Sequence, residues 1–490
     1  MSSINPMPGS ELRLWRRRFL GQAGLGLGAA ALAGLWHGST RDCDAGMAHA
    51  GPPAEAGGHR SVPRAKRVIS LFMHGGPSQL ELFDYKPALR SMHGRELPES
   101  IRQTQRLTGM TSGQKSFPIA APLSRYRVSG ESGAWVSELL PWTGRVVDRL
   151  AIVRSLYTEA INHDPAVTLM QTGHQQPGRP SFGAWASYGL GSESENLPAF
   201  VVLISRGSAA RPADPLYARL WGSGFLPSNH QGTPLRAGAD PVLYLSNPAG
   251  ISRTIRRGQL DLLSALNLQQ QEREGDPETA ARIAQFELAF RMQSAVPELT
   301  DMAEETAETL AMYGAESERP GSFAHNCLIA RRLVERGVRF VQLYHRGWDQ
   351  HYNLPSDLRL QCRDVDQASA ALVLDLERRG LLDETLVVWC GEFGRTVYSQ
   401  GALEPQNYGR DHHGGCFSGW LAGGGVRAGQ VLGETDDFSV SVVRDPVHVH
   451  DLNATLLHLL GVDHTKLTWR FQGRDYRLTD VSGRVIAGLI

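Results

Sequence analysis

Acidic and imidazole side chains gather in one stretch near the end of the chain. Glu392 follows the apolar run Leu386–Cys390, and Asp411, His412 and His413 come further along the same stretch. Carboxylate and imidazole together suit zinc, manganese or iron, and carboxylate-rich groups suit calcium or magnesium. The stretch therefore predicts a metal site, with a polar surface loop carrying incidental histidines as the alternative.

A second group of metal-binding residue types follows the apolar run Val338–Tyr344. Here Asp349 and His351 flank a single residue, so in extended backbone both side chains point the same way. This spacing favours a pair of ligands to one ion. Arg346 lies in the same loop, and we expect it to hold an anionic substrate.

A third group follows the apolar run Leu150–Val153. Thr158, Asn162 and His163 supply a hydroxyl, an amide and an imidazole within a few residues, which suits a nucleophile or an anion site. The alternative is a helix start with Asn162 or Asp164 as its cap. Both hold together when a helix N-terminus binds the anion.

The apolar runs that precede these groups have the length of buried strands and alternate with helical segments. This pattern predicts an α/β fold with a mostly parallel central sheet, flanked by helices on both faces. Ligands bind at the carboxyl ends of such strands. The first strand, Val68–Met73, ends in a Gly-Gly turn that allows close backbone approach to a ligand, and we expect His74 and Ser78 to contact the substrate there.

The middle of the chain changes character. Residues 206–325 combine polar loops with two helical runs, and we interpret them as a helical and loop cap insertion that contributes substrate selectivity. The helices expected in and after this segment are Ser252–Leu266, Pro277–Met292, Asn326–Arg336, Arg363–Arg379 and Val447–Leu460.

The N-terminal residues predict an export signal. Three arginines, Arg16 to Arg18, precede the weakly apolar run Gly21–Trp36, which matches a twin-arginine signal, and Ala48-His49-Ala50 fits a cleavage site. We therefore expect a signal peptide over 1–50, a linker over 51–65 and one α/β domain over 66–490. The expected partner is the twin-arginine export machinery, the expected location is periplasmic or secreted, and no stable span is expected in the mature chain. An uncleaved anchor is the alternative.

The overall composition is that of a globular protein. The 490 residues include 50 basic and 50 acidic side chains, so nothing in the charge balance favours binding to nucleic acid. Four cysteines follow the signal, an even number that permits disulfides in an oxidising compartment. They are Cys327, Cys362, Cys390 and Cys416.

Five short motifs together resemble one family of exported proteins, the domain of unknown function 1501 family. That family is similar to the alkaline phosphatase and sulfatase superfamily. The resemblance implies an alkaline phosphatase-like fold over most of the chain after the linker. The motifs are Gly75–Ser78, Trp348–His351, Gly391–Arg395, Gly409–His412 and Gly473–Asp480.

The superfamily resemblance implies divalent metals and a serine or threonine nucleophile between them. Asp349 and His351 would be one ligand pair, with Glu392 and either His412 or His413 completing the site. The implied metal is zinc, manganese or calcium. Asp411 is a further ligand candidate, which could instead orient a neighbouring histidine.

The catalytic residues implied by the resemblance are Thr158 as nucleophile and Arg395 as the group that binds the anion. The sequence departs from the superfamily at His74, where relatives carry an aspartate. It also lacks the Cys-x-Pro-x-Arg motif of true sulfatases. A metal-activated hydroxide is an equally good nucleophile.

These observations favour an exported, metal-dependent hydrolase of phosphate or sulfate esters. Its substrate would be a small-molecule or polysaccharide anionic ester. One alternative is a non-catalytic binding protein that retains the hydrolase fold, and another is a structural module of the cell envelope.

Overall fold

A nine-stranded sheet organises the protein in the computed structural model, which describes residues 62–490 apart from 209–214, 239–240, 244 and 276. The expected signal peptide lies outside the described residues. The strand order is β12-β4-β11-β8-β1-β7-β5-β6, with β15 beside β4. The strands are β1 Arg67–His74, β4 Leu150–Tyr157, β5 Phe200–Ser205, β6 Thr233–Leu235, β7 Phe340–Arg346, β8 Thr385–Cys390, β11 Phe417–Ala422, β12 Gln430–Leu432 and β15 Val447–His448.

All strands of this sheet except β11 run in one direction. Parallel pairs join β1 to β7 and β8, and β5 to β6 and β7, whereas β11 lies antiparallel between β4 and β8. The predicted mostly parallel sheet is therefore confirmed. Its consequence for function is that β1, β4, β5, β7 and β8 all end at the same edge.

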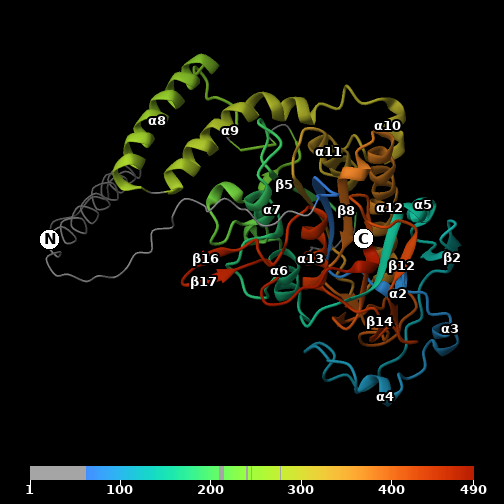
Figure 1. Ribbon diagram of the computed structural model, residues 1–490. Coiled ribbons are helices and arrows are strands. Elements are labelled where there is room, and N and C mark those ends of the chain that lie inside the picture. The colour runs from blue at the N-terminus through green and yellow to red at the C-terminus, as the bar shows by residue number, and fades with distance from the viewer. Residues whose placement is uncertain (1–61, 209–214, 239–240, 244, 276) are drawn as a thin grey trace, which may run out of the picture. The chain divides into compact units, whose positions relative to one another are not determined.

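Helices cover both faces of the sheet (Figure 1). Alternation along β1 sends Ile69 and Leu71 into one apolar core and Val68 and Phe72 into another. The first core includes residues of α5 Pro141–Val146, α11 Phe323–Glu335 and α12 Leu354–Arg378. The second includes residues of α6 His163–Thr172, α7 Phe182–Leu190 and α13 Val449–Leu459.

The expected cap insertion is partly continuous with the main sheet. Within residues 206–325, β6 pairs with β5 and so extends the sheet by one strand. The rest of the segment contains α8 Arg253–Glu274, α9 Pro277–Thr300 and α10 Ala307–Tyr313. A role of this segment in substrate selectivity stays a prediction.

Several predicted helices differ from the observed elements at their N-terminal ends. The helix expected over Asn326–Arg336 begins at Phe323. The helix expected over Arg363–Arg379 begins at Leu354, where a proline stands in the first turn. The helix expected from Val447 begins at Val449, because Val447 and His448 first pair with β4. His448 then caps the helix by accepting a hydrogen bond from the backbone of His450.

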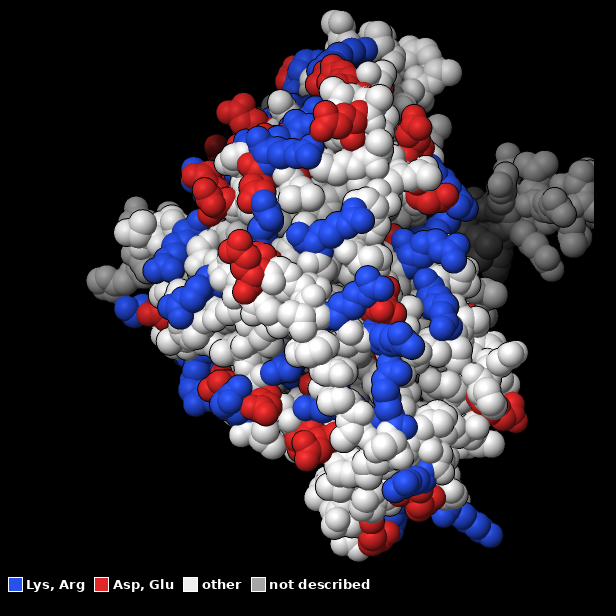
Figure 2. Space-filling model, turned by 90° about the vertical axis from the view of Figure 1, so that its right-hand side faces the viewer, with Lys and Arg blue, Asp and Glu red and all other residues white. Residues whose placement is uncertain are grey.

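The distribution of charged side chains on the surface agrees with the equal numbers of basic and acidic residues in the sequence. Basic and acidic side chains are interspersed on the face drawn in Figure 2. Among the described helices, none combines the length and apolar character needed to cross a bilayer. The four cysteines of the described chain are buried and unpaired. The disulfides that their even number permits are not formed among these four, and the cysteines act as core residues.

Candidate metal centre

Four side chains from three distant segments meet at the carboxyl edge of the sheet. They are His163 at the start of α6, Asp349 and His351 after β7, and His412, and we name them the His–Asp cluster. One nitrogen or carboxylate oxygen of each lies within 4.8 Å of those of the others. Their arrangement could hold a metal ion, because three imidazoles and a carboxylate form a typical site for zinc, manganese or iron.

The imidazoles of His351 and His412 are oriented by hydrogen bonds on the far side of each ring. The Nδ1 of His412 lies 2.8 Å from the carbonyl oxygen of Ile161, and the Nδ1 of His351 lies 2.6 Å from Oε1 of Gln400. Both partners are acceptors, so each Nδ1 carries the proton and each neutral ring presents a bare Nε2 to the cluster. The two Nε2 atoms face each other at 3.0 Å.

His163 is held between two carboxylates. Its Nδ1 lies 2.6 Å from Oε1 of Glu392, and its Nε2 lies 3.1 Å from Oδ1 of Asp349. Burial alone would lower the pKa of His163, but its hydrogen bonds to Asp349 and Glu392 raise that pKa to about 9. The ring is therefore protonated at neutral pH when no ion is bound.

Glu392 stands behind His163 and is not among the four clustered side chains. It is fully buried and accepts hydrogen bonds from the backbone N–H of Gly75 at 3.0 and 3.2 Å. Burial opposes the charge, yet the hydrogen bond from His163 lowers the pKa of Glu392. This arrangement is the carboxylate–histidine pair commonly found behind metal ligands, which fixes the ring and increases its basicity. The predicted ligand thus has the position of an orienting partner.

Arg395 fixes Asp349 rather than facing a substrate. Its guanidinium is fully buried, donates to Oδ1 of Asp349 at 2.6 Å and also donates to the carbonyl oxygens of Gly75, Gly76 and Arg410. Although burial would raise it, the pKa of Asp349 is held well below its usual range by the Arg395 charge. Because Arg395 is already committed to these groups, its expected role in binding an anion is not supported by its position.

A short antiparallel pair explains why one of two adjacent histidines enters the cluster. Strand β9, Gly394–Arg395, pairs with β10, His412–His413, and places His412 opposite Arg395. Successive strand residues point to opposite faces. His413 therefore points away, and its Nε2 lies 2.7 Å from the carbonyl oxygen of Val440.

Asp411 also lies outside the cluster. Its carboxylate accepts hydrogen bonds from the hydroxyls of Thr108 and Thr111, both at 2.6 Å, and from the backbone N–H of His412 at 2.7 Å. It therefore anchors the backbone that carries His412 and has the orienting position that the sequence left open as the alternative.

Two glycines allow the loops of the site to approach each other. Gly75 has a φ of +118°, and a Cβ there would lie 2.5 Å from the backbone nitrogen of Asp349. A Cβ on Gly409 would lie 2.0 Å from the carbonyl carbon of His351. We expected the first of these glycines to approach a ligand, but it approaches the backbone of the Asp349 loop instead.

The remaining predicted residues are not among the four clustered side chains. His74 is buried, with its ring centroid 6.2 Å from that of His163. Asn162 is exposed just before α6. Thr158 is buried, and its hydroxyl accepts from the backbone N–H of Ala160 at 3.2 Å. Ser78 is also buried and its hydroxyl has no hydrogen-bond partner among the described residues.

The cluster is open to solvent on one side. The exposed fraction of the side chain is 25% for Asp349, 15% for His163 and 13% for His351, but only 4% for His412. The ring of Phe393 forms the closed side, with centroids 4.8 Å from His163 and 4.7 Å from His412. A small ligand can therefore reach an ion from the side of Asp349.

Sequence reasoning did not assign His163 to the metal, nor Gln400 and the Ile161 carbonyl to orienting roles. The signal for His163 was its place immediately after a strand end, which suggested an anion site equally well. No local pattern marks Gln400, since it meets His351 only in the folded chain.

Comparisons with solved structures give distant likenesses. Ps i-CgsB in complex with k-i-k-neocarrahexaose is 12% identical, covers 81% of this chain and 72% of its own, and has a TM-score of 0.33. A TAB5 alkaline phosphatase mutant is 11% identical, with 74% and 92% covered and a TM-score of 0.29. The phosphonate monoester hydrolase of Agrobacterium radiobacter is 11% identical, with 82% and 74% covered and a TM-score of 0.33. Scores this low carry no argument about activity.

A comparison with curated proteins finds no match. In contrast, a family model described as protein of unknown function (DUF1501) matches residues 65–490. That match spans the sheet, both helical layers and the whole His–Asp cluster. The chain therefore belongs to the DUF1501 family.

Proposed function

We propose that this protein is an exported, metal-dependent hydrolase of phosphate or sulfate esters. The observation that carries the proposal is the convergence of three imidazole Nε2 atoms on Asp349, each ring having its Nδ1 tied to an acceptor. Such outer partners are the usual support of metal-binding histidines. The four ligands suit zinc or manganese better than calcium, which takes six to eight oxygens.

A bound divalent ion would polarise an ester oxygen and lower the pKa of a water molecule toward neutrality. The protein's own contribution is to place and charge the ligands. Arg395 keeps Asp349 ionised, and Glu392 keeps His163 in one orientation. The hydroxyl of Thr158 is engaged in its own turn, so a water molecule is the better nucleophile.

A non-catalytic binding protein is the second candidate. The same observation on Thr158 favours it, because its hydroxyl is buried in a turn and shows no sign of activation. In that case the ion would only connect the loops that carry His163, His351 and His412.

The test uses the full-length protein purified from the exported fraction. Bound metal is measured, and turnover of 4-nitrophenyl phosphate and 4-nitrophenyl sulfate is followed before chelation, after chelation, and after adding back zinc, manganese or calcium. Metal-dependent turnover of either ester supports the hydrolase. Bound metal without turnover favours the binding protein, and no bound metal under any condition contradicts both.

A further inference from the structure

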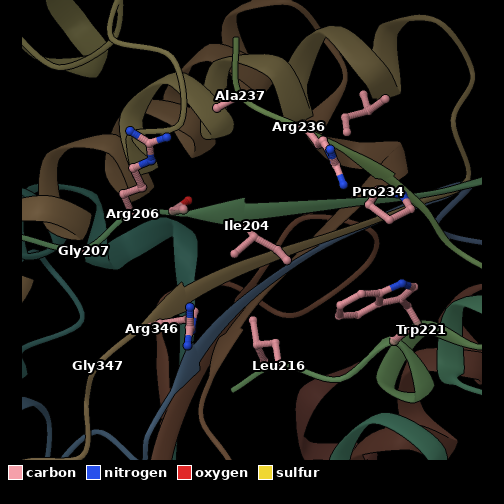
Figure 3. A pocket seen from close by; sticks show the side chains of 13 residues that line it. Ile204, Arg206, Gly207, Leu216, Trp221, Pro234, Arg236, Ala237, Arg346 and Gly347 are labelled. Atoms are coloured by element: carbon pink, nitrogen blue, oxygen red, sulfur yellow. The ribbon is translucent and has the colours of Figure 1, made fainter. Parts of the chain in front are cut away.

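A pocket with a volume of about 780 Å³ opens beside the His–Asp cluster, at the carboxyl ends of β5 and β7 (Figure 3). It lies between these strands, β6 and the short helix Ala218–Trp221. None of the four clustered residues lines it. The pocket is therefore a separate feature of the same sheet edge.

The charge of this pocket is one-sided. Its thirteen described lining residues include Arg206, Arg236 and Arg346 and no acidic side chain. Neither Arg206 nor Arg236 has an ion-pair partner among the described residues. These two guanidinium charges on one concave surface create a positive potential that an anion would relieve. The pocket thus favours a ligand that carries negative charge.

The pocket also has an apolar floor. Figure 3 shows Ile204 between the arginines, with Leu216 and Trp221 at one side. Ile204 is 37% exposed, although the rest of its strand is buried. Apolar and aromatic surface with a few polar groups at the rim is typical of sites that bind the ring of a small ligand. The pocket therefore fits a ring-shaped body that bears anionic groups.

The pocket and the cluster are joined by the end of one strand. Arg346 lines the pocket and is the last residue of β7, and Asp349 follows it closely in sequence. Because extended backbone covers about 3.3–3.6 Å per residue, the Cα atoms of these two residues lie within about 11 Å of each other. A ligand of one or two rings can span that distance.

We propose that this pocket binds the non-reacting part of the substrate, and that this part is itself anionic. The preferred substrate is then a phosphate or sulfate ester whose ring-shaped body carries at least a second anionic group. The statement that the ligand is a substrate rests on the proposed hydrolase function, whereas the binding of an anionic ligand in this pocket does not. Arginine suits this role because its planar fork pairs with tetrahedral oxyanions.

The test measures binding by calorimetry without any turnover. The probes are a disaccharide with two sulfate groups, its unsulfated parent, a sugar bisphosphate and inorganic sulfate. Wild type is compared with Arg206→Gln, Arg236→Gln and the double variant. Arg95→Gln is the matched control, because Arg95 is an exposed arginine far from the pocket in sequence. Thermal unfolding of each variant shows that it is folded.

We expect wild type to bind at least one of the two doubly charged probes at least tenfold more tightly than inorganic sulfate and than the unsulfated parent. Which of the two binds better tells sulfate from phosphate recognition. Each arginine substitution should weaken that binding about tenfold, as losing a hydrogen bond to a charged group does. Arg95→Gln should bind like wild type. Equal binding by wild type and the folded double variant, or equal binding of the unsulfated parent, would overturn the inference.

These outcomes separate the inference from the proposed function. A protein that binds the charged probe through Arg206 and Arg236 but hydrolyses no ester contradicts the hydrolase and supports the pocket. A protein that hydrolyses 4-nitrophenyl esters but shows no preference for the doubly charged probes supports the hydrolase and contradicts the pocket.

Discussion

The Nε2 atoms of His351 and His412 face each other at 3.0 Å. Because each Nδ1 donates to an acceptor, both facing nitrogens are bare when the rings are neutral, and two lone pairs at this distance repel. Burial lowers the pKa of His412 to about 4, so this ring is neutral at neutral pH and brings no proton of its own to the contact. A cation between the nitrogens does relieve it, and this is the physical reason for assigning the cluster to a metal.

Alanine substitutions of the two adjacent histidines of β10 should have opposite effects on metal binding. His412→Ala should abolish metal binding at the concentrations that saturate wild type, because it removes a ligand atom. His413→Ala should keep the metal, because its ring is bonded to the Val440 carbonyl on the opposite face. Metal content of the two purified variants is the measurement. Equal metal content in both would contradict the placement of His412 in the cluster.

Substitution of Glu392 should weaken the site without removing it. Glu392→Gln keeps an acceptor for the N–H of Gly75 but loses the charge that supports His163. Loss of such an outer partner costs about 10–100-fold in metal affinity. Titration with zinc should therefore reach the wild-type stoichiometry at higher concentration. A variant that never reaches it would show that Glu392 is itself a ligand.

Metal affinity should rise with pH between about 7 and 9. The pKa of His163 is about 9 without metal, so an ion must displace its proton at neutral pH. The apparent affinity should then increase roughly tenfold per pH unit in this interval, with about one proton released per ion. Calorimetry in buffers of different ionisation enthalpy measures both. A flat affinity over this interval would contradict the assignment of His163 as a ligand.

The raised pKa of His163 also predicts how the stability of the metal-free fold depends on pH. Since the pKa of His163 is raised above its ordinary value near 6.5, this group stabilises the fold fully below pH 6.5. That contribution is lost as pH rises toward 9. His412 acts in the opposite sense, because its lowered pKa removes stability as pH falls from 6.5 toward 4.

Export should depend on the arginines that precede the first apolar run. Changing both Arg16 and Arg17 to Lys should retain the protein in the cytoplasm, because the twin-arginine machinery reads the pair itself. The fractionation of the double variant against wild type is the measurement, with Arg13→Lys as the matched control. Unchanged export of the double variant would contradict the twin-arginine interpretation.

Much of the fold was predictable, because buried parallel strands are apolar on both faces. The apolar runs Val68–Met73, Leu150–Val153, Val338–Tyr344 and Leu386–Cys390 all overlap strands of one sheet. The residues at which helices and strands begin were less predictable. Val447 and His448 have the composition of the helix that follows them, and only their pairing with β4 makes them a strand.

The candidate site was predictable in part. Sequence spacing named Asp349 and His351 together, and the structure places both in the cluster with one of the two histidines of β10. The sequence pattern could not distinguish the ligands from the residues that orient them. Asp411 meets Thr108 and Thr111 from a distant segment, and Arg395 is buried against Asp349. Such contacts exist only once the loops from different strands have met.

The most direct test is a crystal structure of the protein with zinc or manganese, in which the ion is located by anomalous scattering. The account predicts one ion within about 2.0–2.3 Å of Nε2 of His163, His351 and His412 and of a carboxylate oxygen of Asp349. Glu392 and Gln400 should keep their hydrogen bonds to the rings. An ion held by Glu392 and His413 instead, or no ion at the cluster at saturating metal, would contradict the account.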